Sequence, residues 1–259
     1  MTLPPRLETA LLGPESLTVA LSGGIDSLTL SAAAARVRGV EGVTLCHAVS
    51  PAVPEAATGR VRAFARQHGL VLRVVDAGEF ADPQYRANPV NRCYFCKSNL
   101  YGTLARMGDQ VAAGTNTDDL SDYRPGLVAA DENRVIHPFV EARMSKADVR
   151  KLARALGLGD LADLPAAPCL ASRIETGLRV EPRDLQMIDK AEARLRAELG
   201  NVTLRCRRMK AGWAIELDPV VLDAMDQKSR GRLIDLAALP DEGEVTLRSY
   251  KRGSAFVHG

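Results

Sequence analysis

A chain of 259 residues, 46% of them hydrophobic, is long enough for one large globular domain or two unequal ones. The formal net charge of +2 argues against general nucleic-acid binding, which needs a concentrated basic surface. No run of about 20 apolar residues occurs, so no membrane span is expected. The first 14 residues lack a signal-peptide pattern, and we therefore expect a cytoplasmic protein.

The first half of the sequence alternates between short apolar runs and amphipathic stretches. The apolar runs predict strands at 17–21, 43–48, 70–75 and 110–113, and the amphipathic stretches predict helices at 27–38, 55–68 and 93–107. Residues 79–92 contain Pro83 and Pro89 and are expected to form a loop. Alternating strands and helices are typical of βαβ units, so we expect an α/β fold with a parallel sheet.

The second half begins with a strongly signalled helix at 145–156, where Ser145 and Asp148 form a capping pair and Gly157 follows the end. Residues 159–176 are proline-rich and irregular. A charged helix is expected at 181–199, strands at 202–207, 213–217 and 244–247, and a further helix at 220–239. This change of pattern predicts two domains, 1–176 and a small α+β domain at 177–259.

A glycine-containing loop, Ser22-Gly-Gly-Ile-Asp-Ser27, lies between the first predicted strand and helix. Its glycines permit close approach of the backbone to an oxyanion, and the following helix adds its positive N-terminal end. The spacing is neither GxxxxGK[ST] nor GxGxxG, and it suits a released pyrophosphate. An ordinary polar turn is the alternative interpretation. The predicted nucleotide-binding residues are Ser22, Gly23, Gly24, Asp26 and Ser27.

The odd number of cysteines argues against a disulfide framework and favours thiol or metal chemistry; they are Cys46, Cys93, Cys96, Cys169 and Cys206. Cys93 and Cys96 lie one helical turn apart, so both could face one metal or cluster. Cys169 lies in an irregular segment near Arg173, whose charge favours a thiolate. Three thiolates could hold a cubane cluster, whereas zinc would want a fourth ligand, for which His137 is the obvious candidate. The remaining two cysteines are expected to be small buried hydrophobes.

Several motifs in order resemble the LarE family of ATP-dependent sulfur transferases, also called sacrificial sulfur transferases, within the PP-loop ATP pyrophosphatase superfamily. They are SGGIDS (22–27), NRCYFCK (91–97), GTNTDDLSDYRPG (114–126), HPF.EA (137–142), PCLASRIETG (168–177) and YKRGS (250–254). The resemblance covers most of the chain. It implies an adenine-nucleotide α-hydrolase-like domain with a small C-terminal domain, often assembled as a homohexamer.

The resemblance also implies a reaction. ATP would adenylate a carboxylate of a pyridinium biscarboxylic acid mononucleotide and release pyrophosphate, and a sulfur nucleophile would displace AMP, as a step towards the nickel-pincer nucleotide cofactor of lactate racemase. In one subgroup the cysteine matching Cys169 gives up its own sulfur and becomes dehydroalanine. In another, three cysteines hold a [4Fe–4S] cluster that carries a sulfide. Because Cys93, Cys96 and Cys169 are all present, the sequence favours the cluster subgroup.

Other residues receive roles from the same resemblance. Asp26 and Asp119 would serve Mg²⁺, and Asn116 would align the nucleotide, although turn formation and helix capping explain Asn116, Asp118 and Asp119 equally well. Ser172 and Arg173 would contact the substrate or the AMP phosphate. Asp122, Tyr123 and Arg124 could equally be structural.

Arg205 and Arg207 would share one face of a strand and bind the mononucleotide phosphate; a charged strand edge or a contact with a neighbouring subunit is the alternative. Trp213 is expected in the core.

Two other functions fit parts of the pattern. A tRNA thiolation enzyme can also combine such a loop with a three-cysteine cluster, but this chain shows no broad basic surface. An ATP-binding module with a structural metal and no enzymatic activity is the second alternative. One fold hosts many reactions, so the motifs rather than the fold favour the sulfur transferase.

Overall fold

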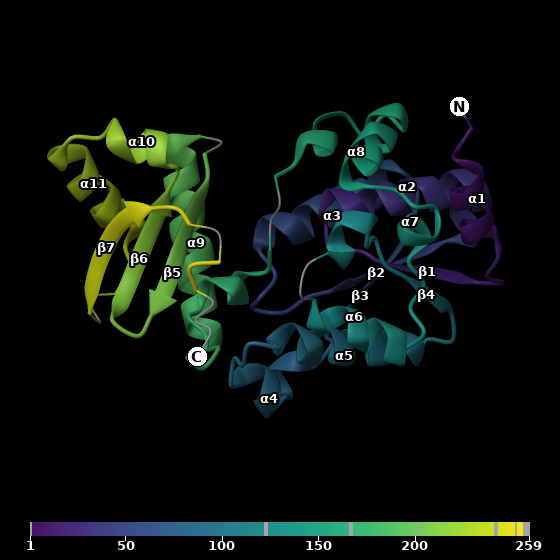
Figure 1. Ribbon diagram of the computed structural model, residues 1–259, viewed down its shortest axis with the longest axis horizontal. Helices are drawn as coiled ribbons and strands as arrows, with labels where there is room; N and C mark the ends of the chain where they lie inside the picture. The colour runs from purple at the N-terminus through teal and green to yellow at the C-terminus, as the bar shows by residue number, and fades with distance from the viewer. Residues whose placement is uncertain are drawn as a thin grey trace. The chain divides into compact units, whose positions relative to one another are not determined.

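The computed structural model describes residues 2–121, 124–165, 168–200, 202–240, 243–251 and 253–255 (Figure 1). The chain divides into two compact units. Unit 1 comprises Met1–Asp82 and Cys93–Ala167, and unit 2 comprises Pro83–Arg92 and Pro168–Gly259. This division differs from the predicted domains, because Pro83–Arg92 joins unit 2 and the later boundary lies nine residues before the predicted one at 176.

Unit 1 is built on a four-stranded parallel sheet, counted over the residues described, with the order β3-β2-β1-β4. Its strands are β1 (Leu17–Ala20), β2 (Thr44–Ala48), β3 (Val71–Val75) and β4 (Gln110–Ala112). All four were predicted within two residues, because short apolar runs ended by polar or glycine residues identify buried strands well. The α/β fold with a parallel sheet is confirmed.

The helices of unit 1 cover both faces of this sheet. They are α1 (Pro5–Leu12), α2 (Ile25–Arg38), α3 (Glu55–Gln67), α5 (Arg92–Ala105), α6 (Pro125–Glu132), α7 (Pro138–Glu141) and α8 (Lys146–Ala155). Leu45 packs in the core beneath α1, α2 and α8, whereas its neighbour Cys46 packs in the core formed with α5 and α6. Successive residues of a strand point to opposite faces, so the two layers of helices each have their own core.

The predicted loop at 79–92 was wrong in part. It contains a 3₁₀ turn at Glu79–Ala81 and a short helix, α4 (Pro83–Arg86). Pro83 begins the helix rather than excluding it, since proline lacks only a backbone N–H that the first helical turn leaves unpaired anyway. Two further 3₁₀ turns, Gly159–Asp163 and Leu170–Arg173, occupy the segment expected to be irregular.

Unit 2 contains a three-stranded sheet in the part of the chain that is described, with β5 (Leu204–Met209) antiparallel to β6 (Gly212–Leu217) and β7 (Glu244–Ser249) parallel to β6. Its helices are α9 (Pro182–Leu199), α10 (Pro219–Asp223) and α11 (Gln227–Ala237). The single helix predicted at 220–239 was wrong. Asp218 and Asp226 each cap a separate helix through a side-chain oxygen, so the chain stops and restarts between α10 and α11.

None of the helices that the structure describes has the length and apolar character needed to cross a membrane.

Candidate functional site

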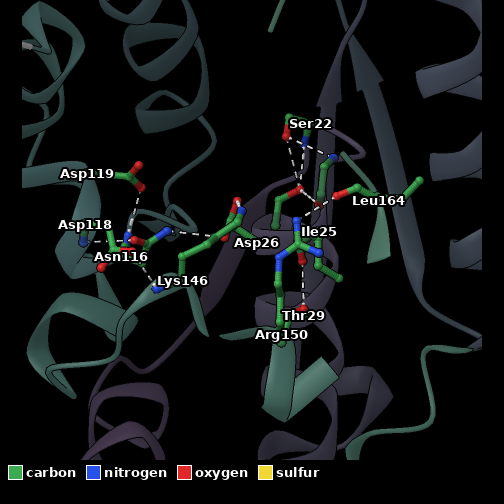
Figure 2. Close-up of polar contacts among 12 residues, drawn as sticks. Ser22, Ile25, Asp26, Thr29, Asn116, Asp118, Asp119, Lys146, Arg150 and Leu164 are labelled. Carbon is green, nitrogen blue, oxygen red and sulfur yellow. Dashed lines mark hydrogen bonds and ion pairs between the residues drawn. The ribbon is translucent and has the colours of Figure 1, made fainter. Parts of the chain in front are cut away.

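The loop Ser22–Ser27 is closed by its own two serine hydroxyls between β1 and α2 (Figure 2). The Ser27 Oγ accepts from the Ser22 backbone N–H at 3.2 Å, lies 3.2 Å from the Ser22 Oγ and donates to the Gly24 carbonyl at 3.0 Å. The Gly24 N–H donates to the Ser22 Oγ at 3.3 Å, and Gly24 is the N-cap of α2. The turn therefore ends at a helix N-terminus, which favours an anion.

Two glycines allow other backbone segments to approach this loop. Gly23 has a φ of +80°, and a Cβ there would lie 3.0 Å from the Ala57 carbonyl oxygen on α3. A Cβ on Gly114, which follows β4, would lie 2.8 Å from the Asp26 carbonyl carbon and 2.9 Å from the Ser27 nitrogen. A Cβ at either position would press against backbone atoms, so glycine is needed at both contacts. The loop therefore packs closely against α3 on one side and against the segment after β4 on the other.

Asp26 is held by two polar side chains from distant parts of the sequence (Figure 2). The Lys146 Nζ lies 2.5 Å from Asp26 Oδ2, and the Asn116 Nδ2 donates to Asp26 Oδ1 at 3.3 Å. Lys146 is the first residue of α8, whose N-terminus is closed by the predicted capping box of Ser145 and Asp148. The sequence analysis noted that cap and missed Lys146. A positive charge is unfavourable in the first turn of a helix, and that misfit was the available signal.

Asn116 has the capping role that the sequence left open, and its predicted alignment of a nucleotide stays a prediction. It caps the 3₁₀ turn Thr117–Leu120, since its Oδ1 accepts from the Asp118 N–H at 3.0 Å, and its amide also reaches Asp26. Asp119 accepts from the Asn116 N–H at 3.1 Å and pairs with Arg124 at 2.7 Å. Its predicted role as a metal ligand stays a prediction. Two residues of the same motif, Asp122 and Tyr123, lie outside the described residues.

The cysteines fall into two classes. Cys93 is exposed and Cys96 is half-buried, both in the first turns of α5 in unit 1, and Cys169 is half-buried in unit 2. Among the described residues, no three histidine, cysteine or acidic side chains are grouped closely enough to hold a metal ion. The cluster on Cys93, Cys96 and Cys169 stays a prediction.

The other two cysteines, Cys46 and Cys206, are buried as expected. Burial raises the pKa of the Cys46 thiol to about 11 and raises that of Cys206 further, so both remain protonated.

The segment that carries Cys169 is organised by a buried arginine. The Arg173 Nη1 donates to the carbonyls of Pro168 at 2.6 Å and Cys169 at 3.2 Å, and to the Ser172 Oγ at 3.0 Å. The other side of the guanidinium forms two bonds with Glu192, at 3.0 and 3.1 Å, with both side chains almost completely buried. Arg173 thus holds the turn beside Cys169. The predicted contacts of Ser172 and Arg173 with substrate stay predictions.

Arg205 and Arg207 differ in their surroundings. Arg207 is buried, donates from Nε to Glu216 at 2.6 Å and from Nη1 to the Ser172 carbonyl at 3.0 Å. Arg205 is half-buried, with its guanidinium 5.9 Å from the centre of the Tyr250 ring. Phosphate binding by this pair stays a prediction.

Trp213 is buried in the core as expected, and of the YKRGS tail the structure describes all but Arg252.

Two more residues behind the loop were missed by the sequence analysis. His47 on β2 is buried and joins the Leu21 carbonyl at 2.7 Å to the Thr58 Oγ at 3.0 Å. Burial lowers its pKa, so the ring is neutral at pH 7, with Nδ1–H donating to the carbonyl. Arg60 on α3 donates from Nε to the Gly23 carbonyl at 2.7 Å. Both positions look unremarkable in sequence because their partners lie on other elements.

The fold and this site define an α/β protein with a Rossmann-like unit, whose glycine-containing loop follows the carboxyl end of β1. No family model matches the chain. It is 39% identical over 222 residues to the uncharacterized protein slr1717 of Synechocystis, which covers 83% of this chain and 82% of the relative. It is 29% identical over 220 residues to the uncharacterized protein MJ0830 of Methanocaldococcus jannaschii, with 83% and 82% covered.

A third relative has a named activity. The pyridinium-3,5-bisthiocarboxylic acid mononucleotide synthase of Lactiplantibacillus plantarum is 31% identical over 206 residues, covering 78% of this chain and 74% of the synthase. The chain belongs to the LarE-type family of this synthase.

Proposed function

We propose that this protein is an ATP-dependent sulfur transferase. It adenylates a carboxylate of pyridinium-3,5-biscarboxylic acid mononucleotide, releases pyrophosphate and replaces a carboxylate oxygen with sulfur. The observation that carries the proposal is the closed loop Ser22–Ser27 with Asp26 held at its end by Lys146 and Asn116, in a chain of the synthase family.

The loop and the residues around Asp26 suit the adenylation step. A carboxylate is a poor electrophile because its leaving group would be oxide, and attack on the α-phosphate of ATP gives it AMP as a leaving group. The N-terminus of α2 and the Lys146 ammonium favour the negative phosphates, and Lys146 can exchange the Asp26 carboxylate for a phosphate oxygen. Asp26 offers the oxygen ligand that Mg²⁺ prefers, and the bound ion would neutralise phosphate charge.

The sulfur would come through Cys169. The thiols of Cys93 and Cys96 lie one turn apart on α5, and a [4Fe–4S] cluster, if held by these two cysteines and Cys169, would supply an exchangeable sulfide. In the sacrificial alternative, the Cys169 Sγ attacks the acyl group and AMP leaves. Loss of the Cα proton then breaks the Cβ–Sγ bond, which leaves the thiocarboxylate and dehydroalanine. The presence of all three cysteines supports the first route.

The test is turnover by anaerobically purified protein with ATP, Mg²⁺ and the mononucleotide. We expect release of pyrophosphate and AMP, and a product mass that shows oxygen replaced by sulfur. Cys169→Ala should release pyrophosphate without forming that product, and Cys46→Ala, which changes a buried thiol, should still form it. The intact mass of the chain after turnover separates the routes, because only the sacrificial route removes sulfur from Cys169. Wild-type protein that releases no pyrophosphate under these conditions contradicts the proposal.

A further inference from the structure

One face of α3 packs against the phosphate loop at Gly23. A Cβ on Gly23 would meet the Ala57 carbonyl oxygen at 3.0 Å and the Val61 Cγ2 at 3.1 Å. Arg60 lies between these two positions in the sequence, and its Nε donates to the Gly23 carbonyl at 2.7 Å. The guanidinium is therefore fixed at the turn of the loop, on the backbone of the residue whose φ is +80°.

The charge of Arg60 has no carboxylate partner among the residues described. Within the part of the chain that the structure describes, the guanidinium donates to the Gly23 carbonyl and to no other group, although the side chain is half-buried and burial lowers the pKa of its guanidinium. Two of the buried arginines of unit 2 are different, since Arg173 pairs with Glu192 and Arg207 pairs with Glu216. A third, Arg92, donates to the Asn88 Oδ1. A partly desolvated cation without a counter-ion is costly, and an anion arriving at the loop would remove that cost.

We infer that Arg60 is an anion-binding residue of this loop and contacts the terminal phosphates of the nucleotide, the part that leaves as pyrophosphate. The inference rests on the proposed function for the identity of the anion. With Nε committed to Gly23, the Nη nitrogens remain as donors, and the planar guanidinium matches two phosphate oxygens at once. Arg60 lies on the Gly23 side of the loop, whereas Lys146 and Asn116 lie at Asp26. Arg60 and Lys146 thus place positive charge at different parts of the loop.

The experiment measures binding of inorganic pyrophosphate, ATP and AMP to the full chain by calorimetry. Arg60→Gln should weaken pyrophosphate and ATP by roughly tenfold to a hundredfold, the range for a lost charged hydrogen bond, and leave AMP unchanged. Arg66→Gln, an exposed arginine on the same helix, is the matched control and should change none of the three. Arg60→Lys keeps the charge but loses the planar fork that can bond Gly23 and two phosphate oxygens together, so it should bind pyrophosphate more weakly than wild type.

The relative affinities for pyrophosphate, ATP and AMP distinguish a direct contact between Arg60 and phosphate from a purely structural role of Arg60 in the loop. Equal losses for AMP and pyrophosphate would mean that Arg60 only shapes the loop, and unchanged pyrophosphate affinity in Arg60→Gln or Arg60→Lys would also overturn the inference. The inference stands and the proposed function fails if three results are found together. The wild type binds pyrophosphate, Arg60→Gln does not bind it, and the wild type releases no pyrophosphate from ATP. Wild-type protein that binds neither pyrophosphate nor ATP refutes both.

Discussion

The Lys146 ammonium and the Asp26 carboxylate are joined by an ion pair of 2.5 Å, which ties the first residue of α8 to the second residue of α2 across 120 positions of the sequence. Both side chains keep about a third of their surface exposed, at 31% and 28%, so a ligand can reach the pair. Exposed pairs contribute little to stability. A cation kept at an unfavourable helix N-terminus therefore points to binding rather than to folding.

Removing that cation should affect nucleotide use more than stability. For Lys146→Met we expect the kcat/KM for ATP to fall by roughly tenfold to a hundredfold, because a charged contact to phosphate is lost. The measurement is the rate of pyrophosphate release as a function of ATP concentration. Lys151→Met, which removes an exposed lysine from the same helix, is the control and should behave as wild type. Equal rates for the two variants would show that Lys146 does not contact ATP.

Gly114→Ala should deform the loop Ser22–Ser27. The added Cβ would lie 2.8 Å from the Asp26 carbonyl carbon, and overpacking of this kind costs about 1–3 kcal/mol. We expect ATP and pyrophosphate affinity to be lost in a chain that still folds, as measured by calorimetry and thermal unfolding. The matched change is Gly59→Ala on α3, where a Cβ meets no atom within 4 Å; this variant should bind as wild type and gain about 0.4–1 kcal/mol of stability. Normal nucleotide binding by Gly114→Ala would contradict the packing argument.

Glu192→Gln should destabilise unit 2. It leaves the buried Arg173 without its counter-ion, and breaking such a pair costs about 3–5 kcal/mol. Burial alone would raise the pKa of Glu192, but Arg173 and Arg196 outweigh it and lower the pKa below its ordinary 4.5. The pair therefore stabilises the folded chain fully above pH 4.5, and this contribution is lost as the pH falls through the lower folded-state pKa.

Chemical denaturation of both proteins over a range of pH checks this. The difference in unfolding free energy between wild type and Glu192→Gln should be constant near neutral pH and shrink in acid. Glu198→Gln on the same helix removes an exposed pair with Arg232 and should cost less than about 1 kcal/mol. A wild-type advantage that grows as the pH falls would reverse the assigned sign.

The five thiols should react in two groups. Alkylation of the native, metal-free chain should modify Cys93, Cys96 and Cys169, because they are exposed or half-buried. Cys46 and Cys206 should react only after denaturation, because they are buried and their pKa values are raised. Peptide mass mapping before and after denaturation checks this. Rapid native labelling of Cys206 would contradict its burial.

Local signals explain which elements could be predicted. The Ser145–Asp148 capping box involves residues three apart, so its sequence pattern is enough to identify it, and the structure confirms it. The break between α10 and α11 was missed although Asp218 and Asp226 are cap residues and the seven residues 226–232 contain no apolar side chain. Helix boundaries depend on capping as well as on burial.

The sequence by itself determined the four strands of the parallel sheet, helices α2, α3, α5 and α8, the position of the glycine-containing loop and the two classes of cysteine, since these follow from short-range patterns of apolar, glycine and thiol residues. Helices α1, α6 and α7 were not predicted. Only the tertiary structure decided that Lys146 and Asn116 meet Asp26, that Arg60 bonds to Gly23, and that Arg173 is neutralised by Glu192. Charged side chains have no periodic pattern that identifies their partners. Their pairing depends on which elements the hydrophobic core brings together and on which charges remain buried without water.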